Sequence, residues 1–239
     1  MDGIVLTFDV FGVYQGAFVM ADRETGTVWA HLTGEALAGP LAGRRLLPLP
    51  VTMTSFGAWL DLHPDSLAPD PGVMVRPITV RPGQRRLRQD FAATLEALDR
   101  RLDPHALVVG VQRERTARAY VLDPDRPGPT IHHDRLDGKP IVLLAPPGAW
   151  PLAYAAEARD ERGTTSLVDL RLDGESLVDA DGSTWSWHGH ALRGPRAGAT
   201  LSFIASHVTE WYAWAAYHPD TEISSLAFPF VGRDREPEP

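Results

Sequence analysis

The chain opens with apolar and aromatic runs separated by short turn sequences, a pattern typical of β-strands. Apolar residues fill 4–11, 17–21 and 27–32, and the turn DRETG separates the last two runs. Further strand-like runs lie at 46–53, 106–111, 115–122, 140–144, 152–156, 167–172, 175–178, 183–188 and 201–205. The pattern predicts a fold that is mainly β with a few short α-helices (α+β).

Helical spacing of apolar residues is confined to three stretches. Two short helices are predicted after Thr54 and Thr209, which have the side chain of an N-cap residue. The longest amphipathic pattern covers 87–102, where one face would carry Phe91, Leu95, Leu98 and Leu102. This third helix is interpreted as a spacer between two halves of the chain, because a single apolar stripe is usually part of a core.

One long stretch, Asp22–Asp65, occurs a second time as Asp179–Asp220. Eight residues recur with one constant offset of 155 positions (189 minus 34, 218 minus 63). The pairs are Gly34 with Gly189, Leu37 with Leu192, Gly39 with Gly194, Pro40 with Pro195, Gly43 with Gly198, Thr54 with Thr209, Trp59 with Trp214 and His63 with His218. A constant register over eight pairs predicts an internal duplication, and hence a pseudo-twofold β-sheet or barrel-like architecture.

The repeat and the composition together suggest an organisation for the whole chain. Residues 1–68 would form the first repeat, of which only the back half is present, and 69–104 a Pro-rich linker with the amphipathic helix. Residues 105–230 would form a second, fuller repeat, and 231–239 a charged tail that frays. These parts are expected to form one compact domain.

Charge and composition exclude several classes of function. The net charge of −8 argues against a nucleic-acid-binding protein, which needs a basic surface. The chain contains no cysteine, which excludes disulfides, thiol nucleophiles and thiolate metal sites. No apolar run approaches the roughly 20 residues that span a bilayer, and no signal peptide is visible. A soluble, cytoplasmic protein is expected as the chain stands, or an extracytoplasmic one if the true N-terminus lies upstream.

Histidines supply the main candidates for metal chemistry. His188 and His190 flank a glycine, and on a strand such alternate residues share one face, as a metal pair requires. A third ligand would come from His132, His133 or Asp134. The first copy has no equivalent pair, so this candidate divalent-metal site lies outside the repeated framework.

The repeated residues are interpreted first as structural. His63 and His218 each precede a proline at a predicted helix end, where the helix dipole favours a histidine. The recurring glycines and prolines would shape a tight corner in each copy. Trp29, Trp59, Trp185 and Trp214 are expected to form two mirrored cores, and the alternative is a groove for a sugar or hydrophobic ligand.

Several motifs resemble an uncharacterised bacterial family, the domain-of-unknown-function 3179 family. The run DRETGTVWAHLTGEALAGPLAGRRL, followed by TSFGAWLDLHPD, is similar to the pattern DRxTGSxWxxLTGEAxxGPLxGxxL and the Trp-bearing helix of its members. The segments TARAY (116–120) and IHHD (131–134) resemble two further family segments. Members typically carry an upstream segment with a CPLC-like motif, which this chain lacks, so no role of those cysteines is transferred.

These observations favour a non-catalytic ligand-binding or structural module. No acid–base pair recurs in both copies, and no catalytic residue is identified. No cofactor is expected under this hypothesis. The alternative is a metal-dependent enzyme or metal-binding protein built around His188 and His190. The expected partners are a second copy of this chain, in a homo-oligomer, or a full-length relative of the family.

Overall fold

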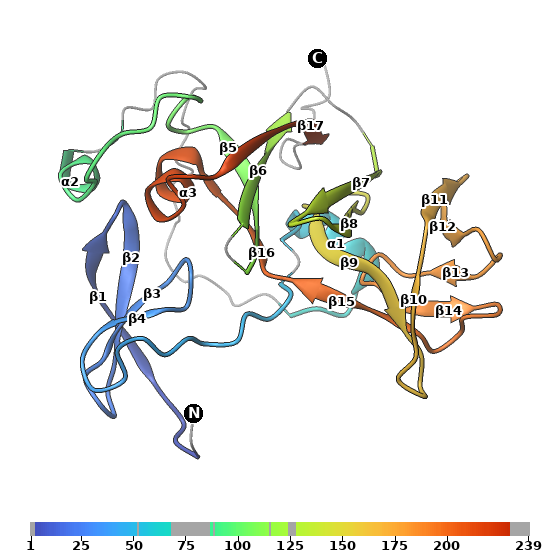
Figure 1. The fold of residues 1–239 in the computed structure, drawn as a ribbon, viewed down its shortest axis with the longest axis horizontal. Coiled ribbons are helices and arrows are strands. Elements are labelled where there is room, and N and C mark those ends of the chain that lie inside the picture. Colours follow the sequence, from blue (N-terminus) through green and yellow to red (C-terminus); the bar gives the residue numbers. More distant parts are fainter. Residues whose placement is uncertain are drawn as a thin grey trace. The chain divides into compact units, whose positions relative to one another are not determined.

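The structure is a computed structural model that describes residues 3–51, 53–67, 87, 89–114, 116–123 and 128–229. In these ranges the chain forms seventeen β-strands and three short helices (Figure 1). The mainly β prediction is therefore confirmed. The strands form four sheets with open strand orders, so barrel-like closure stays a prediction. The predicted tail at 231–239 lies outside the described residues.

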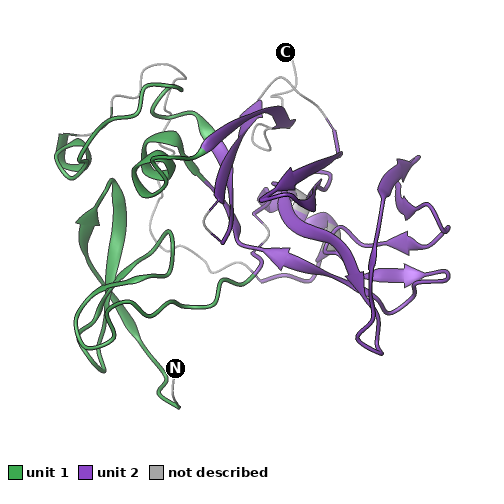
Figure 2. Cartoon of the chain, viewed as in Figure 1, with its two compact units in different colours: residues 1–49, 80–107, 209–221 green, residues 50–79, 108–208, 222–239 purple. Residues whose placement is uncertain are grey.

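The chain divides into two compact units, each made of three sequence segments (Figure 2). Unit 1 contains residues 1–49, 80–107 and 209–221, and unit 2 contains 50–79, 108–208 and 222–239. Each unit thus contains one of the two helices that follow the repeated glycine corners. The division into repeats at 68, 104 and 230 stays a prediction.

Unit 1 is built on an antiparallel meander in the order β1-β2-β3-β4 (Figure 1, blue). Its strands are β1 (Phe8–Tyr14), β2 (Ala17–Asp22), β3 (Val28–Ala30) and β4 (Ala36–Ala38). Gln15 and Gly16 form the β1–β2 turn, and both have the positive φ angles that such a tight reversal needs. Trp29 on β3 is completely buried, as expected for a core tryptophan.

Helix α3 (Trp211–Tyr217) packs against this meander through aromatic side chains. The Tyr212 ring lies so close to Gly16 that a Cβ atom there would be 2.8 Å from it. The Tyr217 hydroxyl donates to the Tyr14 carbonyl at 3.1 Å. Glu210 is the N-cap residue and makes no side-chain capping bond, so the predicted Thr209 cap is wrong.

The amphipathic helix predicted at 87–102 is mostly absent. Only α2 (Gln89–Ala92) forms, and a turn at 93–94 follows it. The Thr94 hydroxyl donates to the Phe91 carbonyl at 2.8 Å and accepts the Gly16 N–H at 3.0 Å. These bonds hold the segment at the β1–β2 turn, and Leu95 and Leu98 of the predicted stripe lie in irregular structure, with Leu98 37% exposed. Phe91, within α2, contacts Phe18 edge-on at 6.1 Å between ring centroids.

Unit 2 is built around a central antiparallel sheet and a second meander. The central sheet has the order β10-β9-β8-β7, with β15 paired to β9, and the meander has the order β11-β12-β13-β14. Their bounds are β7 (Thr130–Leu136), β8 (Lys139–Ala145), β9 (Leu152–Arg159), β10 (Thr165–Leu167), β11 (Leu170–Asp173), β12 (Ser176–Asp179), β13 (Thr184–Trp185), β14 (Ala191–Arg193) and β15 (Thr200–Ile204). A buried apolar cluster that includes Val142, Tyr154, Leu177 and Trp185 joins the two.

A further sheet has the order β16-β5-β6-β17. Its strands are β5 (Leu107–Arg113), β6 (Thr116–Asp123), β16 (Ser206–Glu210) and β17 (Glu222–Pro229). β5 and β6, which were predicted as strands at 106–111 and 115–122, pair antiparallel, and β17 runs parallel to β6. Completely buried residues on these strands include Val108, Val109, Tyr120 and Phe228, and because Val108 and Val109 are adjacent on β5, both faces of that strand are covered.

Helix α1 (Phe56–Leu62) belongs to unit 2. The Thr54 hydroxyl, predicted to cap this helix, donates instead to the Gly148 carbonyl at 2.6 Å. Thr54 also forms an isolated β-bridge with Ala149. The residue therefore attaches the start of α1 to the loop before β9, and the capping prediction is wrong.

The two segments that share the 155-residue offset make the same backbone hydrogen bonds. The Leu46 N–H donates to the Gly34 carbonyl at 2.8 Å, and the Leu201 N–H donates to the Gly189 carbonyl at the same distance. Three further N–H···O=C bonds of the corner recur at 2.9–3.1 Å. In the first copy the donors and acceptors are Ala36 to Arg44, Gly43 to Ala36 and Ala42 to Gly39. In the second copy they are Ala191 to Ala199, Gly198 to Ala191 and Ala197 to Gly194. Helices α1 and α3 also differ by 155 at both ends.

Glycine is required at one position in each corner. Gly39 has a φ of +107°, and a Cβ atom there would lie 2.8 Å from the Thr27 Cα. Gly194 has a φ of +94°, and its Cβ would lie 2.6 Å from the Ser183 Cα. The backbone of each corner therefore lies directly against the preceding turn, which no side chain at these positions would allow.

The corner prolines occupy matched positions in two equivalent turns. Pro40 and Pro195 directly follow these glycines, and both are exposed residues at the start of a turn. In each copy the N–H three residues after the glycine donates to the glycine carbonyl at 3.1 Å, so the proline is the second residue of the turn. Proline suits that position because its ring fixes φ near −65°. The role of Pro40 and Pro195 in shaping the corners stays a prediction.

Candidate functional site

Each meander contains a buried aspartate that organises a turn and a tryptophan. In unit 1 the Trp29 Nε1–H donates to Asp22 at 2.8 Å, and the Thr25 hydroxyl donates to the same carboxylate at 2.9 Å. Burial disfavours the charged carboxylate, but these bonds and the backbone N–H groups of Thr25 and Thr27 outweigh it and lower the pKa of Asp22. The ionised aspartate thus holds the turn and the indole together.

Unit 2 repeats this arrangement around Asp179. The Trp185 Nε1–H donates to Asp179 at 2.9 Å, and the backbone N–H groups of Asp181 and Ser183 donate at 3.0 and 2.8 Å. Here too burial opposes ionisation, and the hydrogen bonds from Trp185 and the turn outweigh it and lower the pKa of Asp179.

Arg196 adds a positive charge to the turn in unit 2. Its Nε lies 3.5 Å from Asp179, and its Nη2 donates to Asp181 at 2.7 Å. The guanidinium also donates to the Ser166 hydroxyl and, at 3.3 Å, to the Leu167 carbonyl. These contacts fix the planar group in one orientation, with acceptors on several sides.

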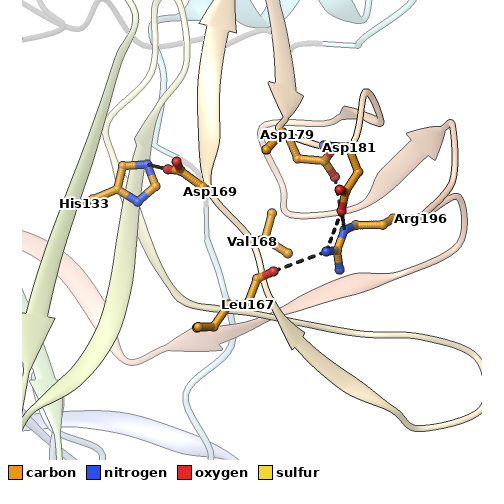
Figure 3. Close-up of a pocket in the computed structure, with 8 residues that line it drawn as sticks. His133, Leu167, Val168, Asp169, Asp179, Asp181 and Arg196 are labelled. Atoms are coloured by element: carbon orange, nitrogen blue, oxygen red, sulfur yellow. Dashed lines mark hydrogen bonds and ion pairs between the residues drawn. The ribbon is translucent and has the colours of Figure 1, made fainter.

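These residues form one wall of an open hollow of about 400 Å³ in unit 2 (Figure 3). The lining residues are His133, Leu167, Val168, Asp169, Asp179, Ala180, Asp181 and Arg196. Figure 3 shows the His133 ring facing Asp169 across from the cluster around Arg196. Three carboxylates thus line the hollow beside one guanidinium, which gives it an excess of negative charge.

The tautomer of His133 follows from its neighbours. Its Nε2 lies 2.8 Å from the Leu170 carbonyl, which can only accept a hydrogen bond, so Nε2 carries a hydrogen. The Asp169 carboxylate lies 3.4 Å from the same nitrogen and its side chain is 85% exposed. In the neutral ring Nδ1 is therefore the hydrogen-bond acceptor.

Unit 2 contains a second polar cluster, which was not predicted from the sequence. Arg118 Nη1 and the Tyr120 hydroxyl both donate to Asp134 Oδ2 at 2.7 Å, and Arg118 also pairs with Glu222. Burial and the Asp134 carboxylate raise the pKa of Tyr120. Burial opposes ionisation of Asp134, but the bonds from Arg118 and Tyr120 outweigh it and lower the pKa of Asp134. The cluster connects β6, β7 and β17.

Two features of the sequence could have indicated this cluster. Arg118 and Tyr120 alternate on one strand, so they share a face. They belong to TARAY and Asp134 belongs to IHHD, the two further segments that resembled family motifs. Because β6 and β7 belong to different sheets and the side chains meet only through the packing of those sheets, spacing alone did not reveal the contact.

A family model described as "Protein of unknown function (DUF3179)" matches residues 1–221. The chain belongs to this family. The resemblance seen in the sequence motifs is therefore confirmed over most of the chain. No curated protein and no solved structure matches the chain. Membership supplies no activity, because the family description states that the function is unknown.

The histidines predicted as metal ligands lie on different elements. His132 and His133 are adjacent on β7, and their partners lie in different strands: His132 Nε2 is 3.2 Å from the Ala227 carbonyl, whereas His133 contacts Leu170. The strand predicted at 183–188 covers only Thr184–Trp185. His188 therefore lies in a turn, and His190 forms only an isolated bridge with Thr200. The shared strand face assumed for the pair is absent.

Within the described ranges no group of three or more His, Cys, Asp or Glu side chains is arranged to hold a metal ion. The divalent-metal site at His188 and His190, with His132 or His133, stays a prediction. In the same ranges no helix is both long and apolar enough to cross a membrane.

Three of the four predicted ligand-binding tryptophans are buried. Trp29 and Trp214 are completely inaccessible, and Trp185 is nearly so, whereas Trp59 is 43% exposed. Trp59 and Trp214 each donate to a hydroxyl seven residues ahead, on Ser66 and Thr221. The rings of His63 and His218 lie 4.2 and 4.0 Å from these indoles, at the ends of α1 and α3. These positions place the buried indoles in core packing.

Proposed function

We propose that the chain is a non-catalytic ligand-binding module built by internal duplication around a pseudo-twofold relation. The matched corner hydrogen bonds, the two Asp–Trp turns and the helices at a constant offset of 155 support the duplication. Independent origins would not reproduce both the sequence register and the hydrogen-bond pattern. The repeated elements form the framework, and the ligand binds where the second copy departs from it.

The hollow around Arg196 is the proposed binding site, and its lining is the observation that carries the proposal. Asp169 and Asp181 expose 85% and 56% of their side chains there, while Arg196 is held by the backbone and by other side chains. A site with a few convergent polar groups on a rigid framework is typical of small-molecule binding. No covalent step is part of this function.

The chemistry of the lining selects the ligand class. Carboxylates only accept hydrogen bonds, and they outnumber the one guanidinium three to one. His133 adds an acceptor at Nδ1 when it is neutral. The site therefore suits a small ligand with a positively charged amino group and several N–H or O–H donors, such as a diamine or an amino sugar.

A thermal-shift assay with small molecules of opposite charge tests this function. Diamines and amino sugars are expected to raise the melting temperature, while dicarboxylates of the same length leave it unchanged. Asp169→Asn is expected to reduce the amine effect at least threefold. Asp173→Asn changes an exposed aspartate on β11 outside the hollow and serves as the matched control.

Two results would overturn the proposal. Stabilisation by dicarboxylates but not amines would show that the hollow does not select by the charge of its lining. Reproducible turnover of any panel compound by the purified chain, absent from Asp169→Asn, would show that the module is an enzyme.

A further inference from the structure

The hollow around Arg196 has an acidic group at each of two ends. At one end Asp169 lies beside the His133 ring, and at the other Asp181 lies beside the Arg196 guanidinium (Figure 3). Their side chains are 85% and 56% exposed, so both carboxylates are accessible from the hollow. Every lining residue belongs to unit 2. The hollow thus presents two separate points of negative charge within one compact unit.

Both carboxylates can accept further hydrogen bonds. Arg196 Nε and Nη2 both donate to Oδ2 of Asp181, at 3.0 and 2.7 Å, and no described residue donates to its Oδ1. No described residue donates to Asp169, because the nearby His133 Nε2–H, 3.4 Å away, is directed to the Leu170 carbonyl. Each end of the hollow can therefore receive the N–H groups of an ammonium ion.

Apolar side chains separate the two ends. In Figure 3 Leu167 and Val168 lie between Asp169 and the residues around Arg196. The Val168 N–H donates to the Ala156 carbonyl at 3.0 Å, which holds this segment against β9. The Leu167 carbonyl is occupied by Arg196, and the Leu167 side chain is 65% exposed. The surface between the carboxylates therefore suits methylene groups, because hydroxyl groups placed there would lose hydrogen bonds to water without replacement.

We propose that the hollow binds a linear aliphatic diamine, with one ammonium group on Asp169 and the other on Asp181. The methylene chain between them lies over Leu167 and Val168. This choice of ligand rests on the proposed binding function of the hollow and narrows its ligand class. An amino sugar with a single ammonium group leaves one carboxylate without a partner and places hydroxyl groups on the apolar surface. The volume of about 400 Å³ is near the lower end of the range for small-molecule sites, as a short ligand requires.

Two linked contacts make the affinity depend on ligand length. Once the first ammonium group is bound, the second reaches its carboxylate only if the methylene chain spans the hollow, and the gain decreases again when the chain is too long. A ligand held by one carboxylate has no such optimum, since each added methylene group only adds apolar contact. A maximum in affinity along a series of diamines is therefore the signature of bridging.

A series of amines tests this signature. Isothermal titration calorimetry on the full chain compares the diamines from 1,2-diaminoethane to 1,8-diaminooctane with monoamines of the same chain length and with glucosamine. The affinity of the diamines is expected to pass through one maximum. The best diamine should bind at least about tenfold more tightly than its monoamine, because its second contact is intramolecular. Glucosamine should bind no more tightly than that monoamine.

Variants of the two ends and of the apolar surface test the assignment. Asp169→Asn and Asp181→Asn should each bring the affinity of the best diamine to within about twofold of its monoamine. Asp173→Asn on β11, outside the hollow, is the matched control and should keep the full difference. Leu167→Ala should weaken the best diamine about threefold, whereas Leu192→Ala, a 60% exposed leucine on β14, should leave it unchanged. Circular dichroism spectra equal to that of the original chain verify that each variant folds.

The outcomes separate bridging from the binding function on which it rests. If no amine binds, both are wrong. If amines bind but the best diamine equals its monoamine, or if affinity rises with every added methylene group, the hollow binds amines at one end and bridging alone is wrong. Glucosamine binding as tight as that of the best diamine, or an undiminished diamine advantage in Asp169→Asn, also contradicts bridging.

Discussion

The two Asp–Trp turns have the same framework but differ in charge. Both use a buried aspartate to hold an indole N–H and the backbone of a turn. In unit 1 the position that matches Arg196 is Leu41, which has no charged side chain and donates its backbone N–H to the Thr27 hydroxyl at 3.2 Å. In unit 2 the Arg196 N–H makes the same bond to Ser183, and the guanidinium adds its contacts to Asp179 and Asp181.

This difference separates the residues that determine the shape of the turn from the charged residues that could bind a ligand. Backbone bonds, a tryptophan and small hydroxyl residues are sufficient for the geometry, since unit 1 has them without an arginine. The charged cluster is an addition to that geometry and lines the proposed binding hollow. Matched substitutions of shared framework residues should therefore lower the free energy of unfolding by similar amounts in the two turns. Substitutions of the charged residues around Arg196 have no counterpart in unit 1.

The largest effects are expected at the corner glycines. Gly194→Ala and Gly39→Ala should each lower the free energy of unfolding by roughly 2–5 kcal/mol, because a Cβ atom meets backbone at 2.6 and 2.8 Å and φ is positive. Urea denaturation measures both. Gly182→Ala has positive φ and open space, so it should cost only about 1–2 kcal/mol. A Gly194→Ala protein as stable as Gly182→Ala would contradict the close approach.

Asp179→Asn should have the next largest effect. The amide cannot accept from both Trp185 and the turn without directing a donor at one of them, which should cost about 1–3 kcal/mol of unfolding free energy. Asp22→Asn should act in the same direction and less strongly, because no arginine loses a partner there. Equal or reversed losses in urea denaturation would argue against the distinct role of Arg196.

The dependence of stability on pH should also reveal the role of Asp179. The folded-state pKa values of Asp22 and Asp179 are lowered, so their contribution is present above the ordinary value of about 4 and disappears as the pH falls through the folded values. Unfolding free energy measured between pH 6 and 3 should therefore decrease toward low pH. The decrease should be smaller in Asp179→Asn, and identical slopes would contradict the assigned role.

The smallest effects on stability should come from exchanging Arg196 and Leu41, the residues that differ between the two turns. Arg196→Leu gives unit 2 the side chain of unit 1 and should cost about 1 kcal/mol or less, because its ion pairs are partly exposed. Leu41→Arg should cost about 1 kcal/mol or less, since Leu41 is only partly buried and a long side chain can keep its charge in water. Differential scanning calorimetry checks both, and a loss of several kcal/mol in Arg196→Leu would show that the arginine shapes the turn.

Local patterns predicted much of the framework. The turn at DRETG, the core tryptophans Trp29 and Trp185, and the short helices ending at His63 and His218 all follow from residue types whose conformation is determined by near neighbours. Periodicity failed at 87–102, because Thr94 bonds to Phe91 and Gly16 and the tertiary contact replaces the helix. The strand predicted at 46–53 is also absent from its described residues, because a strand needs a partner as well as suitable residues.

The candidate site was harder to predict because it depends on contacts between distant segments. Arg196 and Asp181 belong to the β11–β14 meander and His133 to β7, so they line one hollow only when the meander packs beside the central sheet. Arg118 and Asp134 likewise meet through the association of β6 and β7. Alternation on a strand predicts which residues share a face, but a single sequence does not indicate which face of another strand they will contact.

One nuclear magnetic resonance titration tests the central claim, that one framework occurs twice and only its second copy binds a ligand. The tryptophan indoles are labelled with ¹⁵N, and 1,4-diaminobutane is added to the full chain. The Trp185 Nε1–H signal, whose acceptor Asp179 lines the hollow, is expected to shift with a saturable dependence, while the Trp29 signal stays in place. A shift of both signals, of neither, or of Trp29 alone would contradict the account.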